Sequence, residues 1–381
     1  MKTTLKIIVL LFCINLTQAQ EASSLIDTNY QFDGQKLEAS SDTFIFARSF
    51  VDYYYGLMAK NTSQLNIAHA ASSFSGWCVG DAHPENFGIL LQNNSKILFS
   101  MNDMDDFGPC PLAYDFLRLL VTSRLYLPKI NIEQIRNSYL IGLRKENFTA
   151  PLLIQTLASD SQKLGENIDP KKLDGNKFKR KNGMSEVSPA IYQIIASNLA
   201  AIFIQKGFVN GDLRVMDIIS TSRIGGGSGG LLRYEVLCLK GNKDLIRLEL
   251  KELSLPAIYP VATATIPSQS ERMTKALQVE QGNTYSTYYN VFLVGEKTML
   301  LRPKFAGNKG ITLTNSSDQD NTEIISYEAF ILGRIHAASA EASYTDVMKN
   351  LSPVDLESDV TNFTNFLNKK FNEIKRVIPV H

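Results

Sequence analysis

The chain lacks a strong charge of either sign. Its 381 residues carry 39 Lys and Arg against 38 Asp and Glu, so the formal net charge at pH 7 is +1. Because positive and negative charges are nearly equal in number, the chain has no strong electric field to attract nucleic acid or an anionic membrane surface. No nucleic-acid partner is expected. Internal apolar runs are too short to cross a bilayer, so no membrane span is expected either.

Cysteine is also scarce. Four are present, and one of them, Cys13, lies in the apolar segment at the N-terminus. The remaining three are an odd number, which gives no disulfide framework, and their spacing matches no zinc site. We expect small buried residues, with a Cys78–Cys110 bridge as the alternative in an oxidising compartment. The three are Cys78, Cys110 and Cys238.

The N-terminus departs from the rest of the chain. Two lysines precede an apolar run over residues 7–14, and Ala19 supplies a small residue where signal peptidase cleaves. This arrangement predicts a cleavable secretory signal at residues 1–19. The mature protein is therefore expected to be exported, to the periplasm or the cell exterior.

Apolar periodicity divides the remainder into helices and strands. Residues 20–40 are polar and expected to be poorly ordered, and polar loops are expected over 160–187 and 306–322. Helices are expected over residues 42–60, 115–127, 132–145, 188–206, 267–281, 323–340 and 356–377. Strands are expected over residues 77–79, 87–91, 96–101, 215–222, 231–239, 245–253, 288–294 and 297–303.

Two short polar runs carry the chemistry. In Gly80-Asp81-Ala82-His83-Pro84-Glu85-Asn86 a carboxylate stands five positions before an Asn, and Asn102-Asp103-Met104-Asp105-Asp106 follows a β-prone stretch. Phosphoryl transfer uses this order: one Asp orients and deprotonates the acceptor hydroxyl, while an Asn and a second Asp hold Mg²⁺. Carboxylate and amide oxygens are the hard ligands that Mg²⁺ prefers.

A glycine-rich run follows much later. Gly225, Gly227 and Gly230 fit the pattern G-x-G-x-x-G, and the residues after them read as a strand. A dinucleotide site would need a helix there, whereas kinases place a glycine loop between two strands to cover phosphates. No Gly-Lys-Ser/Thr follows, which excludes a Walker loop. A flexible hairpin turn is the alternative interpretation.

The next strand contains Lys251, where kinases carry the lysine that binds the nucleotide phosphates. A lone strand lysine is usually a solvated edge residue. Here a helix follows with Glu271, which is the expected acidic partner of Lys251, and Glu280 is a rival for that role.

These motifs together resemble the bacterial family called domain of unknown function 2252 (DUF2252), grouped with the protein-kinase-like and aminoglycoside-phosphotransferase-like enzymes. The resemblance covers residues 40–345, nearly the whole mature chain. It rests on Phe46-Ala47-Arg48, 80–88, 102–106 with Gly108-Pro109, 115–119, 225–230 with Arg233, 250–252, Glu271-Arg272 and 333–337.

The resemblance implies an α+β fold with two lobes, as in protein kinases. Because the glycine loop follows the catalytic motif here, the order would be circularly permuted, which chains with neighbouring termini tolerate. The implied parts are a helical lobe with the catalytic and metal loops at 41–210, a sheet lobe at 211–305, and C-terminal helices completing the helical lobe at 306–381.

The resemblance also implies the roles of individual residues, with Mg²⁺ and ATP or another nucleotide as cofactors and an unidentified acceptor. Asp115 is expected to be structural, and His336 to be a core or supporting residue. The implied catalytic base is Asp81, the metal ligands are Asn86 and Asp103 with Asp105 as a further candidate, and the nucleotide-binding residues are Gly225, Gly227, Ser228, Gly229, Gly230, Lys251 and Glu271.

Two other functions remain open. A catalytically silent kinase-like binding protein would keep the fold and lose turnover, and export favours it because ATP is scarce outside the cytoplasm. A metal-dependent phosphoesterase would use the Asp81-Ala82-His83 triplet, but such sites need more histidines than the chain's total of four provides.

Overall fold

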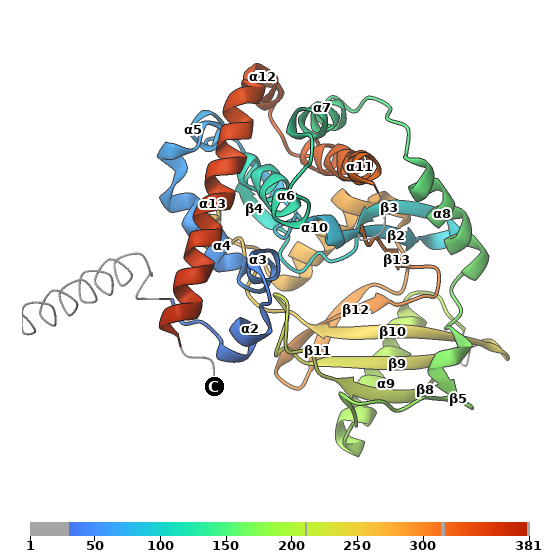
Figure 1. Ribbon diagram of the computed structural model, residues 1–381. Coiled ribbons are helices and arrows are strands. Elements are labelled where there is room, and N and C mark those ends of the chain that lie inside the picture. The colour runs from blue at the N-terminus through green and yellow to red at the C-terminus, as the bar shows by residue number, and fades with distance from the viewer. Residues whose placement is uncertain (1–29, 210–211, 314–316, 379–381) are drawn as a thin grey trace, which may run out of the picture.

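The computed structural model describes residues 30–209, 212–313 and 317–378. The predicted signal segment, residues 1–19, lies outside the described residues. The fold is α+β: a body of packed helices lies against a second body built on an antiparallel sheet (Figure 1). We call these the helical body and the sheet body.

The helical body begins earlier than predicted. Asp33 caps a helix within the segment that was expected to be poorly ordered, and Asp42 caps the next by accepting from the Ile45 N–H at 2.8 Å. The single helix predicted over 42–60 is instead two helices, because the backbone leaves the helical region at Phe50. The four helices are α2 (Gly34–Ala39), α3 (Thr43–Ser49), α4 (Val51–Lys60) and α5 (Asn66–Ala71).

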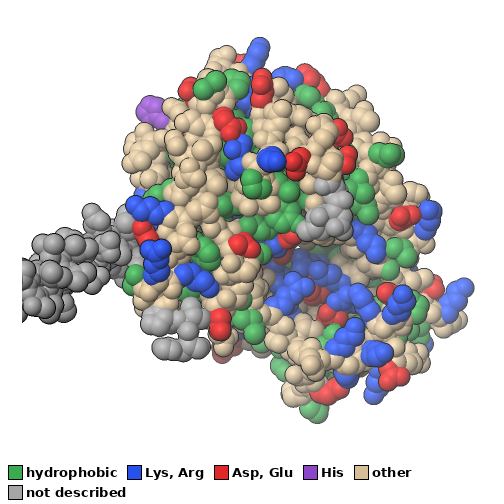
Figure 2. All heavy atoms as spheres, in the orientation of Figure 1, with side chains coloured by type: hydrophobic (Ala, Val, Ile, Leu, Met, Phe, Trp, Pro, Cys, Tyr) green, Lys and Arg blue, Asp and Glu red, His purple; other side chains and the backbone are tan. Residues whose placement is uncertain are grey.

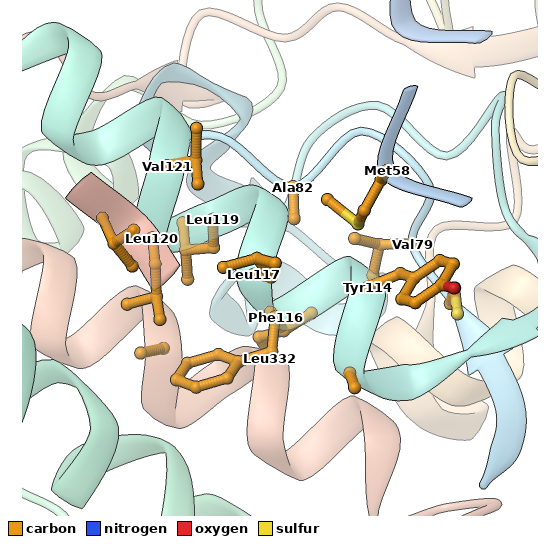
Figure 3. Packing of buried hydrophobic residues seen from close by; sticks show 14 of the residues in the cluster. Met58, Val79, Ala82, Tyr114, Phe116, Leu117, Leu119, Leu120, Val121 and Leu332 are labelled. Atoms are coloured by element: carbon orange, nitrogen blue, oxygen red, sulfur yellow. The ribbon is translucent and has the colours of Figure 1, made fainter. Parts of the chain in front are cut away.

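The centre of the helical body is a helix buried over most of its length, α6 (Leu112–Tyr126). Figure 3 shows its apolar side chains packed against Leu332 of the C-terminal region and Met58 of α4. Helices from the C-terminus return to this core, with α11 against α7 and α13 against α6. The body is completed by α7 (Ile132–Leu143), α8 (Leu152–Leu164), α11 (Asp318–His336), α12 (Ala342–Asn350) and α13 (Pro353–Val377).

The sheet body has six antiparallel strands in the order β11-β12-β10-β9-β8-β7. Helix α9 (Pro189–Gln205) packs on β8 and β11, so we group it with this body, although it precedes residue 211, where the sheet lobe was predicted to begin. Helix α10 (Gln269–Gln281) connects β10 to β11. The strands are β7 (Met184–Glu186), β8 (Leu213–Thr221), β9 (Arg233–Lys240), β10 (Asp244–Glu252), β11 (Asn290–Val294) and β12 (Lys297–Pro303).

Three smaller pairings complete the fold. The predicted hairpin forms as β2 (Phe87–Leu91) and β3 (Ile97–Met101), with β13 (Lys309–Gly310) added beside β2. In the segment predicted as loop, β5 (Leu173–Asp174) pairs with β6 (Lys177–Phe178). Single turns of 3₁₀ helix lie at η1 (Thr62–Gln64), η2 (Pro84–Asn86), η3 (Asn93–Ser95), η4 (Pro170–Lys172), η5 (Tyr259–Val261) and η6 (Gly282–Thr284).

A disulfide fixes the third pairing, between β1 (Ser75–Cys78) and β4 (Gly108–Pro111). Cys78 and Cys110 are bonded, with their Cα atoms 5.8 Å apart. The alternative left open by the sequence is therefore the one observed, and only Cys238 is a free buried thiol among the described residues. The covalent ring encloses both polar runs identified in the sequence.

None of the helices in the described part of the chain is both long and apolar enough to span a membrane.

Candidate functional site

A pocket lies in the cleft between the two bodies and is lined by both. The helical body contributes the two polar runs, and the sheet body contributes the glycine loop and Lys251. Figure 2 shows a hollow between the two bodies, with Lys and Arg side chains gathered in it. Its polar lining includes Asp81, His83, Asn86, Asp103, Asp105, Asp106, Ser228 and Lys251.

The loop carrying Asp81 is held from below by Asp115 of α6. Asp115 Oδ2 accepts the Val79 N–H at 2.8 Å and Oδ1 accepts the Gly80 N–H at 3.2 Å, and His336 Nε2 lies 3.0 Å from Oδ2. Asp115 and His336 are fully buried supports, as predicted. Gly80 has φ +83°, and a Cβ there would lie 2.1 Å from the Asp106 carbonyl oxygen, so only glycine lets the two polar runs meet.

Asp81 itself is held by the Arg118 guanidinium and lies beside the His83 imidazole. Arg118 donates to Asp81 Oδ1 from Nη2 at 2.5 Å and from Nε at 3.2 Å, and His83 Nε2 lies 3.6 Å from Oδ2. Burial opposes ionisation of this carboxyl, but His83 and Arg118 outweigh burial and hold its pKa well below the usual range. Asp81 is therefore an oriented carboxylate anion whose side chain remains partly exposed to the pocket.

Asn86 lies at the end of the same loop, in the turn η2. Its side-chain amide nitrogen donates to the Asp81 carbonyl at 3.0 Å, which leaves the amide oxygen for another partner. The Asn86 carbonyl accepts the Asn102 N–H at 3.0 Å, so the first polar run is hydrogen-bonded directly to the second.

Lys251 joins the sheet body to the second polar run. Its Nζ donates to Asp103 Oδ2 at 2.7 Å and also pairs with Asp105, and the side chain is only 2% exposed. Although burial opposes ionisation, Lys251 and Arg302 hold the pKa of Asp103 well below its usual range. Burial and the neighbouring Asp103 raise the pKa of Asp105 to about 6. The predicted approach of Lys251 to Asp103 is confirmed.

Sequence reasoning missed the ionic layer behind Lys251. On β12, Arg302 donates to Asp103 at 3.2 Å and to Glu249 at 2.6 Å, and Arg233 of β9 lies 3.4 Å from Glu249. Glu249 and Arg302 are cross-strand partners in the sheet register. The alternation of side chains along a strand could have indicated this layer. Glu249 and Lys251 are two positions apart in one strand, so their side chains lie on the same face of the sheet.

The glycine loop connects β8 to β9, as the kinase-like interpretation requires, and contacts the helical body. The Gly226 N–H donates to Ser49 Oγ at 3.3 Å, and Lys36 Nζ donates to the Gly227 carbonyl at 3.0 Å. Gly225, Gly227 and Ser228 line the pocket, whereas Gly229 and Gly230 lie outside its lining. Arg233 also contacts the Ser228 hydroxyl, which fixes the loop from the sheet side.

Comparison with known proteins bears on the first half of the site. Residues 35–128 match the family model described as "Uncharacterized protein conserved in bacteria (DUF2252)". The resemblance to DUF2252, expected over residues 40–345, is confirmed over this segment. No curated protein and no solved structure matches the chain. The DUF2252 segment contains both polar runs, Asp115 and Arg118, while Lys251 and the glycine loop come from the sheet body beyond it.

Glu271 does not join the site assembled around the DUF2252 segment. It lies in the first turn of α10 and forms a capping box with Ser268, in which each accepts from the other's backbone N–H. The expected Lys251–Glu271 pair is therefore wrong, because the DUF2252 segment itself supplies the partners, Asp103 and Asp105. The rival Glu280 is fully buried, and burial raises its pKa well above the usual range.

The DUF2252 residues expected to hold Mg²⁺ fit such an ion. In the described ranges no three His, Cys, Asp or Glu side chains converge as a metal cage. Mg²⁺ does not need one, since it usually takes one or two carboxylates together with substrate phosphates and water. Asp103 and Asp105 share one cation already, and the buried Asp105 Oδ1 has no partner in the described structure.

Proposed function

We propose that this protein is a kinase-like phosphotransferase with a permuted order of lobes, which moves a phosphoryl group from a nucleotide to an acceptor hydroxyl with Mg²⁺. The observation that carries the proposal is the 2.7 Å pair between Lys251 and Asp103. These residues come from different bodies and stand 148 positions apart. Phosphoryl transfer needs a phosphate-binding lysine and a metal-binding Asp in one cleft, and this pair supplies both.

The metal would be held by Asp103 and Asp105 and by the amide oxygen of Asn86. When bound, Mg²⁺ neutralises phosphate charge. The residues keep their own functions around it: Lys251 is placed to bind phosphate oxygens, and Arg302 keeps the Asp103 carboxylate ionised. Gly225, Gly227 and Ser228 line the same pocket, and their backbone N–H groups would cover the phosphates, whereas the Gly226 N–H donates to Ser49 Oγ.

Asp81 is placed to orient the acceptor. With its pKa held low by His83 and Arg118 it is a weak base, but phosphoryl transfer passes through a loose transition state that asks more of positioning than of base strength. Oδ1 is occupied by Arg118, so Oδ2 is the oxygen that would accept a hydrogen bond from the acceptor hydroxyl and later its proton.

A silent binding protein is the second candidate, and one observation favours it. Lys251 already pairs with both Asp103 and Asp105, and Arg118 already occupies Asp81, so the site is electrostatically satisfied without substrate. Such a protein would bind nucleotide and Mg²⁺ and show no turnover.

The test combines binding and turnover on the mature chain with Mg²⁺ and labelled ATP. Asp81→Asn should reduce transfer about 10²- to 10⁴-fold and leave nucleotide affinity unchanged, because Asp81 acts on the acceptor. Asp103→Asn should weaken Mg²⁺-dependent binding, measured by calorimetry. Asp346→Asn, an exposed position on α12, is the matched control.

Hydrolysis of ATP by water gives a readout while the acceptor is unidentified. Binding without any turnover in the parent protein would support the silent candidate. Affinity for Mg²⁺ and ATP that Asp103→Asn leaves untouched would contradict the assignment of the site.

A further inference from the structure

A second recess opens from the same cleft, beyond the two proposed metal ligands. It shares Arg48, Asn86, Asp103 and Arg223 with the pocket that Asp81 lines, so the two spaces adjoin. Asp81 lines only the first of them. We call the second space the cationic recess. It extends between β12 and the segment up to β13 on one side and β2 on the other.

The recess is lined by more cations than carboxylates, in contrast to the pocket beside it. Three of the cations, Lys172, Arg223 and Lys309, have no ion-pair partner among residues 30–209, 212–313 and 317–378. Lys and Arg side chains gather in the hollow between the two bodies in Figure 2. Its charged lining is Arg48, Lys172, Arg223, Arg247, Arg302, Lys304 and Lys309 against Glu85, Asp103 and Asp169.

Lys304 shows how strongly these charges are concentrated. It follows β12 directly and lies 3.6 Å from Glu249, a carboxylate that is already held by Arg302 at 2.6 Å. Burial and the neighbouring Arg302 lower the pKa of Lys304 to about 7. A bound anion would relieve this repulsion, so the recess is poorly satisfied until a negative group enters it.

The position of the recess identifies which part of a substrate it faces. In phosphoryl transfer the attacking and leaving oxygens lie roughly in line on opposite sides of the phosphorus. Asn86 and Asp103 line both spaces, whereas Asp81, the residue proposed to face the acceptor, lines only the first pocket and not the recess. The recess is therefore where the remainder of the phosphoryl donor would lie.

The lining of the cationic recess is poorly suited to a nucleobase. Base and cofactor sites are lined mainly by apolar and aromatic side chains with a few polar groups, whereas seven of the twenty residues that line this recess are Lys or Arg. Its two aromatic residues, Tyr289 and Phe305, are themselves buried and offer little free surface. Lys and Arg side chains, with their flexible and forked donors, suit a run of phosphate groups.

We propose that the cationic recess binds a linear condensed phosphate chain, and that the donor is recognised by this chain rather than by a nucleoside. The inference rests on the proposed phosphotransferase function and names its donor class. In the reaction, the acceptor oxygen forms a bond to the terminal phosphorus, the bond from that phosphorus to the bridging oxygen breaks, and the chain leaves one phosphate shorter. The acceptor proton goes to Asp81.

The experiment measures binding of inorganic tripolyphosphate, a longer inorganic polyphosphate and ATP to the mature chain with Mg²⁺, by calorimetry. Lys304→Met and Lys309→Gln each remove one cation from the recess and none from the pocket with Asp81. Each should weaken binding of the longer chain about tenfold, the value of one charge-assisted hydrogen bond. Lys369→Gln, on the exposed face of α13, is the matched control.

The expected result is that affinity rises from tripolyphosphate to the longer chain and that ATP binds no more tightly than tripolyphosphate. The proposal is overturned if ATP binds about tenfold or more tightly than the longer chain, or if both recess variants leave chain affinity within about twofold of the parent. Thermal melts check folding, and if Lys304→Met does not fold, Lys309→Gln decides alone because its side chain is partly exposed on β13.

The same assays separate this proposal from the proposed function. Polyphosphate binding that depends on Lys304 and Lys309, without transfer from any donor, would support the proposed polyphosphate site. It would contradict the proposed phosphotransferase activity. Transfer from ATP at a rate that both recess variants leave unchanged would support the proposed phosphotransferase activity. It would contradict the proposed polyphosphate site.

Discussion

Lys251 is a buried cation whose partners are two carboxylates from the other body. Replacing it with Met would leave Asp103 and Asp105 close together without their shared cation. We expect Lys251→Met to lower the free energy of unfolding by about 3 kcal/mol, measured by denaturant titration, as is typical when one partner of a buried ion pair is removed. Added Mg²⁺ should restore part of that loss, because it can take the place of the ammonium.

The control is Lys297→Met, in the same sheet. Lys297 pairs with Glu252 at 2.8 Å but is 56% exposed, so its loss should cost no more than about 1 kcal/mol. A Lys251→Met protein as stable as the control would contradict the network described here.

Lys304 should make stability depend on pH in the alkaline range. Burial lowers its pKa to about 7, so between pH 7 and the ordinary lysine value the unfolded chain binds a proton that the folded protein does not. This contribution therefore increases stability as pH rises through that window, and it is lost as pH falls to about 7. Lys304→Met should flatten the slope, measured by thermal unfolding across the window. A slope identical in both proteins would show that Lys304 is not the group.

Among individual residues, the sequence singled out those that stand in local motifs. Asp81, Asn86, Asp103 and Lys251, which line one pocket, were singled out because phosphoryl transfer, the proposed chemistry, uses these residue types in recognisable motifs. Their partners Arg118 and Arg302 were missed, since an arginine on a helix or strand has no local mark of the carboxylate it will contact. Only packing brings Arg118 of α6 under the Asp81 loop.

Among the elements, the β1–β4 pair has the clearest consequence for stability. The Cys78–Cys110 disulfide closes a ring with a sequence separation of 32 residues, which limits the freedom of the unfolded chain. We expect the Cys78→Ala and Cys110→Ala double variant to lose about 3–4 kcal/mol of unfolding free energy, by the loop-entropy estimate. Denaturant titration with and without reductant measures this.

Cys238→Ala controls for loss of a buried thiol without a crosslink. Reductant that leaves the parent protein's stability unchanged would show that the disulfide does not contribute.

Element prediction succeeded where apolar periodicity was long and failed where pairing is short. The hairpin β2–β3 and helices α6, α7 and α9 lie within a few residues of their predicted bounds. Strands β5 and β6 have two residues each, which is too short for any alternation to show, so they exist only through tertiary contacts. The break at Phe50 was missed because the apolar residues on both sides keep a common helical spacing.

For the whole molecule, export remains a prediction from the first residues, which lie outside the described structure. The expected outcome is a mature protein beginning near Gln20, with intact-mass spectrometry of the protein purified from its native host as the measurement. The disulfide between β1 and β4 agrees with an oxidising compartment. Recovery of a chain that still begins at Met1 would exclude cleavage at Ala19.

The sheet body is a continuous insertion, whereas the helical body is assembled from both ends of the chain. Helix α7 finds its main partner in α11, and α6 finds one in α13, so these surfaces stay uncovered until the last residues have been synthesised. The strands from β8 to β12 pair with one another and can form their sheet before the C-terminal helices have been synthesised. A chain emerging from a ribosome or a translocation pore would therefore complete its second body first, and the carboxylates of the candidate site would acquire their final support only when the C-terminal helices arrive.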